Sequence, residues 1–205
     1  MKWVQNKVLD LDRILNLYYR YGVKNLTMDE VAQELGISKR TLYQQVSTKN
    51  ELVELVLNEE FLKFRETMLA AVEKDKGGIR KLFRLYELMS DYFRPLTPVF
   101  IYSLTKMSPL LAADLRNRYN AFIVEVLSQI VEEGKDEGVF LARFKNDFAL
   151  LVAEYLFQTD NGEFCNYTQN LDMINVFYLQ ISGVCSDKGR KILESFIENP
   201  KLLTA

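Results

Sequence analysis

The side chains in this sequence that are best suited to chemistry are hydrogen-bond donors and cations gathered in one short segment. Together with Thr27, they are Ser38, Lys39, Arg40, Thr41, Tyr43, Gln44, Gln45 and Lys49. Such groups donate to phosphate oxygens, and arginine, lysine and glutamine also pair with the edges of bases. The segment therefore has the chemistry of a nucleic-acid contact.

The composition excludes many enzyme mechanisms. The chain has no histidine, which rules out a Ser-His-Asp triad, a Cys-His pair and a histidine-bearing zinc site within one chain. Catalysis by lysine or carboxylates remains open on composition alone. Cys165 and Cys185 are expected to be reduced core thiols, with a disulfide, a redox switch or a partial metal site as alternatives. We predict no enzyme activity, no metal ligands and no cofactor.

Charge is distributed unevenly along the chain. The formal net charge is −2, yet residues 1–50 hold eight Lys/Arg and only five Asp/Glu. This modest asymmetry agrees with nucleic-acid binding near the N-terminus. No secretory signal is recognisable, and no window approaches about 18 uninterrupted apolar residues. We therefore expect a cytoplasmic protein that does not enter a membrane.

Helices are the elements that must position these donors. Apolar residues recur at three- and four-residue steps, and nine glycines and four prolines interrupt them rarely, so we predict an all-α fold with nine or ten helices. Gly22 is expected to end the first helix in a left-handed conformation. Capping boxes at Thr27–Glu30 and Thr48–Glu51 are predicted to open the second and fourth helices. Gly134 and Gly138 mark the expected end of a later, long helix.

Three short helices within residues 8–46, with Gly36 as the turn between the second and third, have the layout of a helix-turn-helix. The residues expected to pack these helices together are Val31, Ala32, Leu35, Ile37, Leu42 and Val46. The third helix is then free to enter the major groove of DNA. The alternative is an ordinary helical bundle with a charged, solvated face. Asp29 and Glu34 are expected to complement the start of the second helix and to face solvent.

The stretch Leu26–Glu51, LTMDEVAQELGISKRTLYQQVSTKNE, resembles the signature of TetR-family transcriptional regulators. It contains the capped helix, the turn from Ala32 to Gly36, the run Ser38–Tyr43 and the downstream Lys49 that are typical of that family. The resemblance covers more than 20 residues. It concerns the N-terminal part of the chain and says little about a ligand.

The resemblance implies an N-terminal three-helix helix-turn-helix DNA-binding domain at residues 1–51 and a C-terminal helical ligand-binding and dimerisation domain at residues 52–205. It implies that the DNA contacts come from Thr27, Ser38, Lys39, Arg40, Thr41, Tyr43, Gln44 and Lys49. Thr41, Tyr43 and Lys49 are expected to hold phosphates. Lys39, Arg40 and Gln44 are expected to contact base edges. Arg40 and the run Gln44-Gln45-Val46 depart from the residues usual in the family, so the operator sequence stays open.

The family resemblance also implies a homodimer on double-stranded operator DNA, with half-sites about 34 Å apart or a multiple of that distance. Two apolar stripes are the candidates for the dimer interface, and burial in the subunit's own core is their alternative. The stripes are Phe148, Leu151, Val152 and Tyr155, and then Ile174, Phe177, Tyr178 and Ile181.

Aromatic and methionine side chains on the central helices could line a pocket for an apolar or aromatic small-molecule effector, although each alone is more often plain core. The candidates are Tyr86, Met89, Phe93, Tyr102, Met107, Tyr119, Phe122 and Phe157. The resemblance implies that an effector bound there would move the fourth helix and release the operator. Repression is the expected mode, with activation as the alternative.

Three other functions stay open. The first is a DNA-binding protein of the same fold with no small-molecule effector, controlled by a protein partner or acting in chromosome organisation. A fully packed C-terminal core would favour it. The second is a helical enzyme or cofactor protein, which a cluster of strongly perturbed carboxylates would favour. The third is a structural helical module, which failure to bind DNA would favour.

Overall fold

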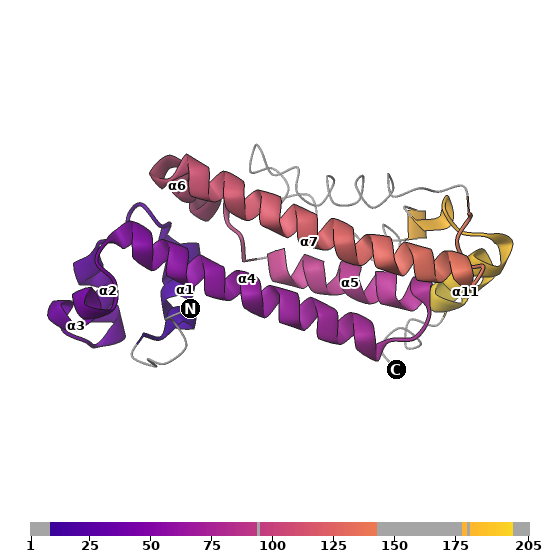
Figure 1. Cartoon of the computed structure of the whole chain (residues 1–205), viewed down its shortest axis with the longest axis horizontal. Coiled ribbons are helices and arrows are strands. Elements are labelled where there is room, and N and C mark those ends of the chain that lie inside the picture. Colours follow the sequence, from indigo (N-terminus) through magenta and orange to yellow (C-terminus); the bar gives the residue numbers. More distant parts are fainter. Residues whose placement is uncertain (1–8, 94, 143–177, 180, 199–205) are drawn as a thin grey trace. The chain divides into compact units, whose positions relative to one another are not determined.

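The structure, a computed structural model, describes residues 9–93, 95–142, 178–179 and 181–198. Its named helices are α1 (Leu11–Tyr21), α2 (Met28–Leu35), α3 (Lys39–Gln45), α4 (Lys49–Lys74), α5 (Gly78–Phe93), α6 (Pro98–Met107), α7 (Pro109–Asp136) and α11 (Asp187–Glu198) (Figure 1). Phe140 and Cys185 form an isolated antiparallel bridge. The predicted all-α fold is confirmed for the described part of the chain. None of the helices in these ranges combines the length and apolarity needed to cross a membrane.

The described residues fall into two compact units. The first contains the residues up to Lys63 together with Pro95–Leu115, and the second contains Phe64–Arg94 and the residues from Arg116 onward. Helices α4 and α7 contribute residues to both units. The predicted functional boundary after residue 51 stays a prediction, and the packing differs from it because α6 groups with the N-terminal helices.

The N-termini of α2 and α4 show how local sequence sets the helix boundaries. At α2 the predicted capping box is confirmed, since the Glu30 backbone N–H donates to Thr27 Oγ1 and the Thr27 N–H donates to the Glu30 carboxylate. At α4 the Glu51 N–H donates to Thr48 Oγ1 at 3.1 Å. The Glu51 carboxylate, however, accepts from the Ser47 N–H at 2.6 Å rather than from Thr48. The second predicted box is therefore half formed, because the carboxylate reaches one residue further back.

In the first unit, α6 packs on α1 through polar and aromatic contacts. Thr97, which caps α6, donates from Oγ1 to the Tyr19 carbonyl at 3.0 Å. The Tyr19 and Phe100 rings meet edge to face with centroids 5.0 Å apart. The buried Ser103 hydroxyl accepts from the Val23 N–H. Residues far apart in sequence thus join α6 to α1 and to the turn that follows it.

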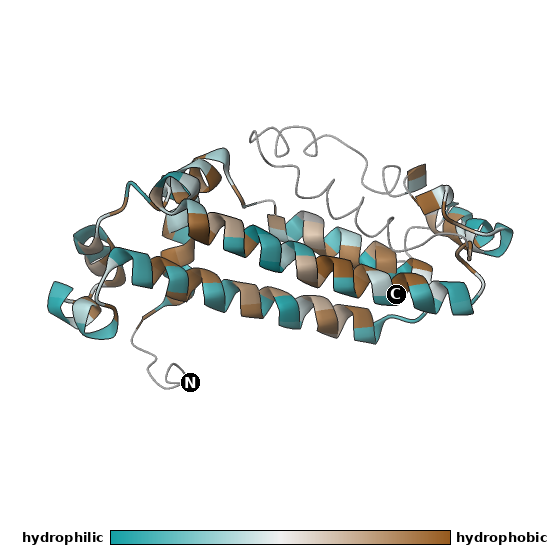
Figure 2. Cartoon of the chain, turned by 45° about the horizontal axis from the view of Figure 1, so that its top comes forward, coloured by the Kyte–Doolittle hydropathy of each residue, from teal (hydrophilic) through white to brown (hydrophobic). Residues whose placement is uncertain are grey.

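In the second unit, the described parts of α4, α5 and α7 share an apolar core. Its largest fully buried side chains are Phe64, Met68, Leu85, Met89, Ile123, Leu127 and Ile130. Figure 2 shows hydrophobic and hydrophilic residues interleaved along the long helices, as amphipathic helices require. α11 packs on α5, with the Arg80 guanidinium 5.9 Å from the centre of the Phe196 ring.

Of the two glycines predicted to mark the end of this helix, Gly138 follows its end with a φ of 72°, whereas Gly134 lies inside α7, which continues to Asp136. The reason for a glycine at position 134 lies in packing rather than in termination. A Cβ at Gly134 would lie 2.2 Å from a carbon of the Phe140 ring, and a Cβ at Gly78 would lie 2.9 Å from the Gly134 Cα. Gly134 therefore lets the start of α5 and the Phe140 ring approach the α7 backbone.

Candidate nucleic-acid interface

The helix-turn-helix is formed by α2, a glycine turn and α3. Gly36 takes the left-handed conformation at the end of α2, with φ 68° and ψ 27°. Ser38 then caps α3 by accepting from the Thr41 N–H at 3.0 Å. Leu42 on α3 and Val31 on α2 are buried, as is Val46 just after α3, and they hold the two helices together. Most of the predicted packing residues are confirmed as buried, while Leu35 and Ile37 are half-buried.

The outer face of α3 carries the predicted donors. Lys39, Arg40 and Gln44 are exposed, as is Tyr43, with 43% of its surface accessible. Thr41 and Gln45 are half-buried. The structure thus brings the predicted α3 residues to one short exposed helix.

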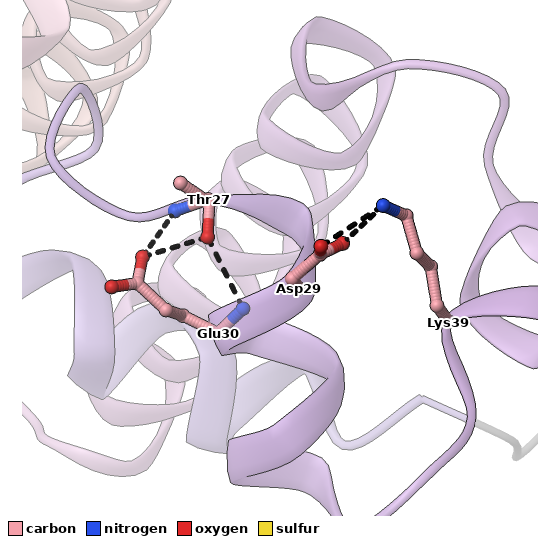
Figure 3. Close-up of polar contacts among 4 residues, drawn as sticks. All are labelled: Thr27, Asp29, Glu30 and Lys39. Carbon is pink, nitrogen blue, oxygen red and sulfur yellow. Dashed lines mark hydrogen bonds and ion pairs between the residues drawn. The ribbon is translucent and has the colours of Figure 1, made fainter.

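Two predicted contact residues use their hydroxyls within the protein. Thr27 Oγ1 donates to the Glu30 carboxylate at 2.8 Å while it caps α2 (Figure 3). The Thr27 N–H donates to the same carboxylate and, with the hydroxyl, lowers the pKa of Glu30. Ser38 Oγ lies 2.8 Å from Thr41 Oγ1. These exposed hydroxyls are therefore held in place by the caps before any ligand is bound.

An ion pair across the turn links α2 to α3. Lys39 Nζ lies 2.7 Å from Asp29 Oδ1 and 2.9 Å from Oδ2 (Figure 3). The hydrogen bond to Asp29 raises the pKa of Lys39. The sequence interpretation had Asp29 facing solvent and missed this pairing. Asp29 is indeed exposed, and the only signal in the sequence is an opposite charge ten positions from Lys39. Glu34 lies 3.9 Å from an Arg13 nitrogen.

Lys49 begins α4 close to the turn between α1 and α2. Its ammonium donates to the Lys24 carbonyl at 2.9 Å, and its side chain is half-buried. Burial lowers the pKa of Lys49, with Glu30 acting weakly in the opposite direction. Two further N–H donors remain on an ammonium that makes one such bond. The arrangement holds the Lys49 ammonium at the start of α4.

Several predicted pocket residues gather in the second unit. Tyr86, Met89 and Phe122 are buried, while Phe93 and Tyr119 are half-buried. Phe64 was missed by the sequence interpretation, yet its ring contacts those of Tyr92, Phe93, Tyr119 and Phe122, with centroids 4.5, 5.8, 4.9 and 5.7 Å away. Tyr92 was also missed, and its hydroxyl lies 2.9 Å from that of Tyr119. We call these five rings the aromatic cluster.

Two other pocket candidates lie in the first unit. Tyr102 is 66% exposed on α6, and Met107 is half-buried at the end of the same helix. Both belong to the first unit, because α6 packs on α1. Phe157 lies outside the described residues.

Most of the predicted dimer stripes lie outside the described residues. This applies to Phe148, Leu151, Val152, Tyr155, Ile174 and Phe177. Tyr178 is half-buried and Ile181 is buried. Cys165 also lies outside the described residues. Cys185 is buried with a free thiol, and burial raises the pKa of this thiol to about 11.

Comparison with known proteins supports the assignment of the head. The profile of the family described as bacterial regulatory proteins, tetR family, matches residues 11–56, which span α1 to α3 and the start of α4. An uncharacterised HTH-type transcriptional regulator of Mycobacterium tuberculosis, found in strains CDC 1551 and H37Rv, is 29% identical over 150 residues. That match covers 67% of this chain and 62% of the relative.

Residues 11–56 therefore carry the helix-turn-helix of the TetR family. The fold of the chain also agrees with solved structures. The TetR-family regulator PfmR from Thermus thermophilus has a TM-score of 0.56 at 23% identity, covering 85% of this chain and 94% of its own. A transcriptional regulator from Saccharomonospora viridis, solved in complex with choline, has a TM-score of 0.61 at 20% identity and covers 92% and 93%. At these identities the likeness concerns the fold alone.

Proposed function

We propose that this chain is a sequence-specific DNA-binding transcriptional regulator of the TetR family that acts as a repressor. The observation that supports the proposal is the exposed outer face of α3, where Lys39, Arg40 and Gln44 stand on a helix seated against α2. A recognition helix inserted in the major groove presents such side chains to base edges.

The roles divide between affinity and sequence reading. Thr41 and Tyr43 lie on α3, and Lys49 is anchored at the start of α4. In our proposal these three contact phosphates, which positions the head on DNA without reading the sequence. Arg40 and Gln44 contact bases, since arginine suits guanine and glutamine suits adenine. Lys39 also contacts a base, and its ion pair with Asp29 limits how it does so.

The regulator works as a homodimer in this proposal. A single α3 of seven residues offers a small contact area, and two copies on adjacent half-sites add their contacts. The two stripes at residues 148–155 and 174–181 remain our candidates for the dimer interface. The buried position of Ile181 agrees equally with packing in the subunit's own core.

A small-molecule effector controls DNA binding in the favoured version of the proposal. The aromatic cluster supplies apolar rings and a pair of tyrosine hydroxyls that could orient a ligand. The Saccharomonospora viridis relative, whose structure contains choline, shows the kind of compound worth testing, because aromatic rings attract quaternary ammonium groups. An effector that binds one conformation of α4 better than another would shift the population away from the DNA-binding state.

The second candidate is a TetR-fold DNA-binding protein with no small-molecule effector. The observation that favours it is the close packing of the aromatic cluster, in which Phe64 is buried against four other rings. The Arg65 guanidinium also lies 5.2 Å from the Phe122 ring centre, so a cation from the protein already occupies that ring.

A binding assay on the DNA that flanks the gene tests the function. Fluorescence anisotropy of labelled intergenic fragments, with a shuffled duplex as the competitor, measures the preference for a specific site. We expect tight binding to at least one fragment, with affinity that falls as salt rises. Equal affinity for every fragment and for the shuffled duplex would contradict sequence-specific binding. Titration of the specific complex with choline and with apolar aromatic compounds then separates the two candidates.

A further inference from the structure

The ion pair between Lys39 and Asp29 lies on the surface that the proposed function assigns to DNA. Lys39 is the first residue of α3, and Asp29 is the second residue of α2, so the pair bridges the helix-turn-helix (Figure 3). The two side chains are exposed over 59% and 63% of their surfaces. Such a pair contributes little to stability. What it changes is the charge and the geometry that α3 offers to a ligand.

The groups around Lys39 take up most of the hydrogen-bond donors of its ammonium. An ammonium has three N–H donors, and the two Asp29 oxygens at 2.7 and 2.9 Å can take two of them. The Tyr43 ring centre lies 5.9 Å from the same nitrogen and attracts the cation from a second side. These contacts orient the Lys39 ammonium and leave one N–H available to an outside acceptor.

We propose that Asp29 determines specificity. Its carboxylate neutralises the charge that Lys39 would otherwise offer to phosphates, and it leaves Lys39 with one oriented N–H donor for a base edge. The inference rests on the proposed DNA-binding function. Affinity for DNA of any sequence grows with the number of phosphates that a protein neutralises, because each one releases counterions. A lysine whose charge is already matched by a carboxylate adds little to this sequence-independent affinity. Its free N–H can still pair with an acceptor such as guanine O6 or N7.

The substitution Asp29→Asn tests the proposal because it removes the charge and keeps the size of the side chain. Binding is measured to the specific fragment and to a shuffled duplex of equal length over a series of salt concentrations. One more neutralised phosphate multiplies affinity by the salt concentration to the power of about −0.9. We expect the variant to bind shuffled DNA about fivefold more tightly at about 0.15 M salt, with a salt slope steeper by about 0.9.

In Asp29→Asn, the affinity for the specific fragment should rise less than the affinity for the shuffled duplex. Lys39 already donates to a base there, so Asp29→Asn gains a charge but loses the orientation of that donor. We expect the preference for the specific fragment to fall at least about threefold. An unchanged preference and an unchanged salt slope, in a variant that melts at the wild-type temperature, would overturn the inference.

Two further variants separate this role from simple repulsion between Asp29 and DNA. Glu34→Gln removes the same charge from the same helix, where the acid lies 3.9 Å from Arg13, and should leave the preference unchanged. In a Lys39→Gln background, Asp29→Asn should no longer tighten binding to shuffled DNA. If it still does so by about fivefold, the effect does not pass through Lys39 and the inference fails.

A measurement without DNA checks that the pair forms in solution. The NMR titration of the Lys39 ammonium should show a lower pKa in Asp29→Asn than in the wild type, and equal pKa values would overturn the inference. A wild-type chain that prefers its fragment while Asp29→Asn changes nothing refutes this inference alone. A wild-type chain that binds neither duplex refutes the proposed function, and this inference falls with it.

Discussion

The Ser103 hydroxyl on α6 accepts a hydrogen bond from the backbone N–H of Val23, 80 residues earlier in the chain, at 2.8 Å. It also donates to the Phe100 carbonyl at 2.9 Å, and Ser103 itself is buried. One side chain thus satisfies a backbone group in the turn after α1 and joins that turn to α6.

Replacing Ser103 by alanine should destabilise the protein by about 1–3 kcal/mol, because the Val23 N–H is left buried without its acceptor. Chemical denaturation followed by circular dichroism measures the change. Thr105→Ala is the matched control, since this exposed hydroxyl donates to the Ile101 carbonyl of its own helix, and it should change stability by less than about 0.5 kcal/mol. Equal effects of the two substitutions would contradict the role given to Ser103.

Tyr18 presents the opposite case to Ser103, because it carries a buried polar group whose removal should not destabilise the protein. Its side chain is fully buried, and within the described part of the chain its hydroxyl has no hydrogen-bond partner. Tyr18→Phe removes that unsatisfied group, so the free energy of unfolding should stay constant or rise by up to about 1 kcal/mol. Tyr18→Ala, which removes the ring as well, should cost about 3–5 kcal/mol. A clear loss of stability in Tyr18→Phe would show that the hydroxyl does have a partner.

Gly134 should not tolerate a side chain. In Gly134→Ala the new methyl would meet the Phe140 ring at 2.2 Å, and relief of that overlap should cost about 1–3 kcal/mol. Gly183→Ala is the control, because nothing lies within 4 Å of a Cβ built there. A Gly134→Ala protein as stable as the wild type would mean that the Phe140 ring moves away freely.

The Cys185 thiol should react slowly in the folded protein. Its pKa is raised by burial from 9.0 to about 11, so at pH 8 the thiolate is scarcer than in a free cysteine. In a Cys165→Ser background, alkylation at pH 8 should be at least about tenfold slower in the native state than in denaturant. The same difference in pKa links stability to pH. Because the pKa of Cys185 is higher in the folded than in the unfolded chain, its protonated thiol favours the folded state; this contribution is complete below pH 9 and is lost as pH rises through 11. Cys185→Ala should lose stability less steeply over that interval, and native alkylation at the denatured rate would contradict the burial of this thiol.

Two alanine substitutions test the division of roles in the proposed DNA contact. Lys49→Ala should weaken binding to every sequence and reduce the salt slope by about 1, whereas Arg40→Ala should cost about 1–3 kcal/mol only on the specific fragment. Lys49 also donates to the Lys24 carbonyl, so thermal melting must show that the variant remains folded. Equal losses on all sequences from both variants would contradict the division.

The sequence predicted the features that depend on neighbouring residues. The Thr27–Glu30 capping box and the Gly36 turn could be predicted because each depends on residues within one or two helical turns. Gly134 was misread for the same reason: a glycine near a helix end predicts termination, while its contact with Phe140 is set by packing.

The candidate site was predictable in its residue types but not in its connections. The donors on α3 follow from the motif, whereas the pairing of Lys39 with Asp29 depends on how two helices cross. The contact between Ser103 and Val23, like the grouping of five rings around Phe64, joins residues that no periodicity relates. Long-range contacts of this kind are set by the packing of whole helices.

The short length of α3 limits how much information it can read. Seven residues span about 10 Å at about 1.5 Å per residue, which matches about three base pairs at about 3.4 Å each. Three fully specified base pairs carry about 6 bits, and the two half-sites of the proposed dimer carry about 12 bits, while one site among about 10⁶ requires about 20 bits. The missing bits must come from the shape and stiffness of the DNA around the contacted base pairs, or the regulator must occupy many sites in its genome.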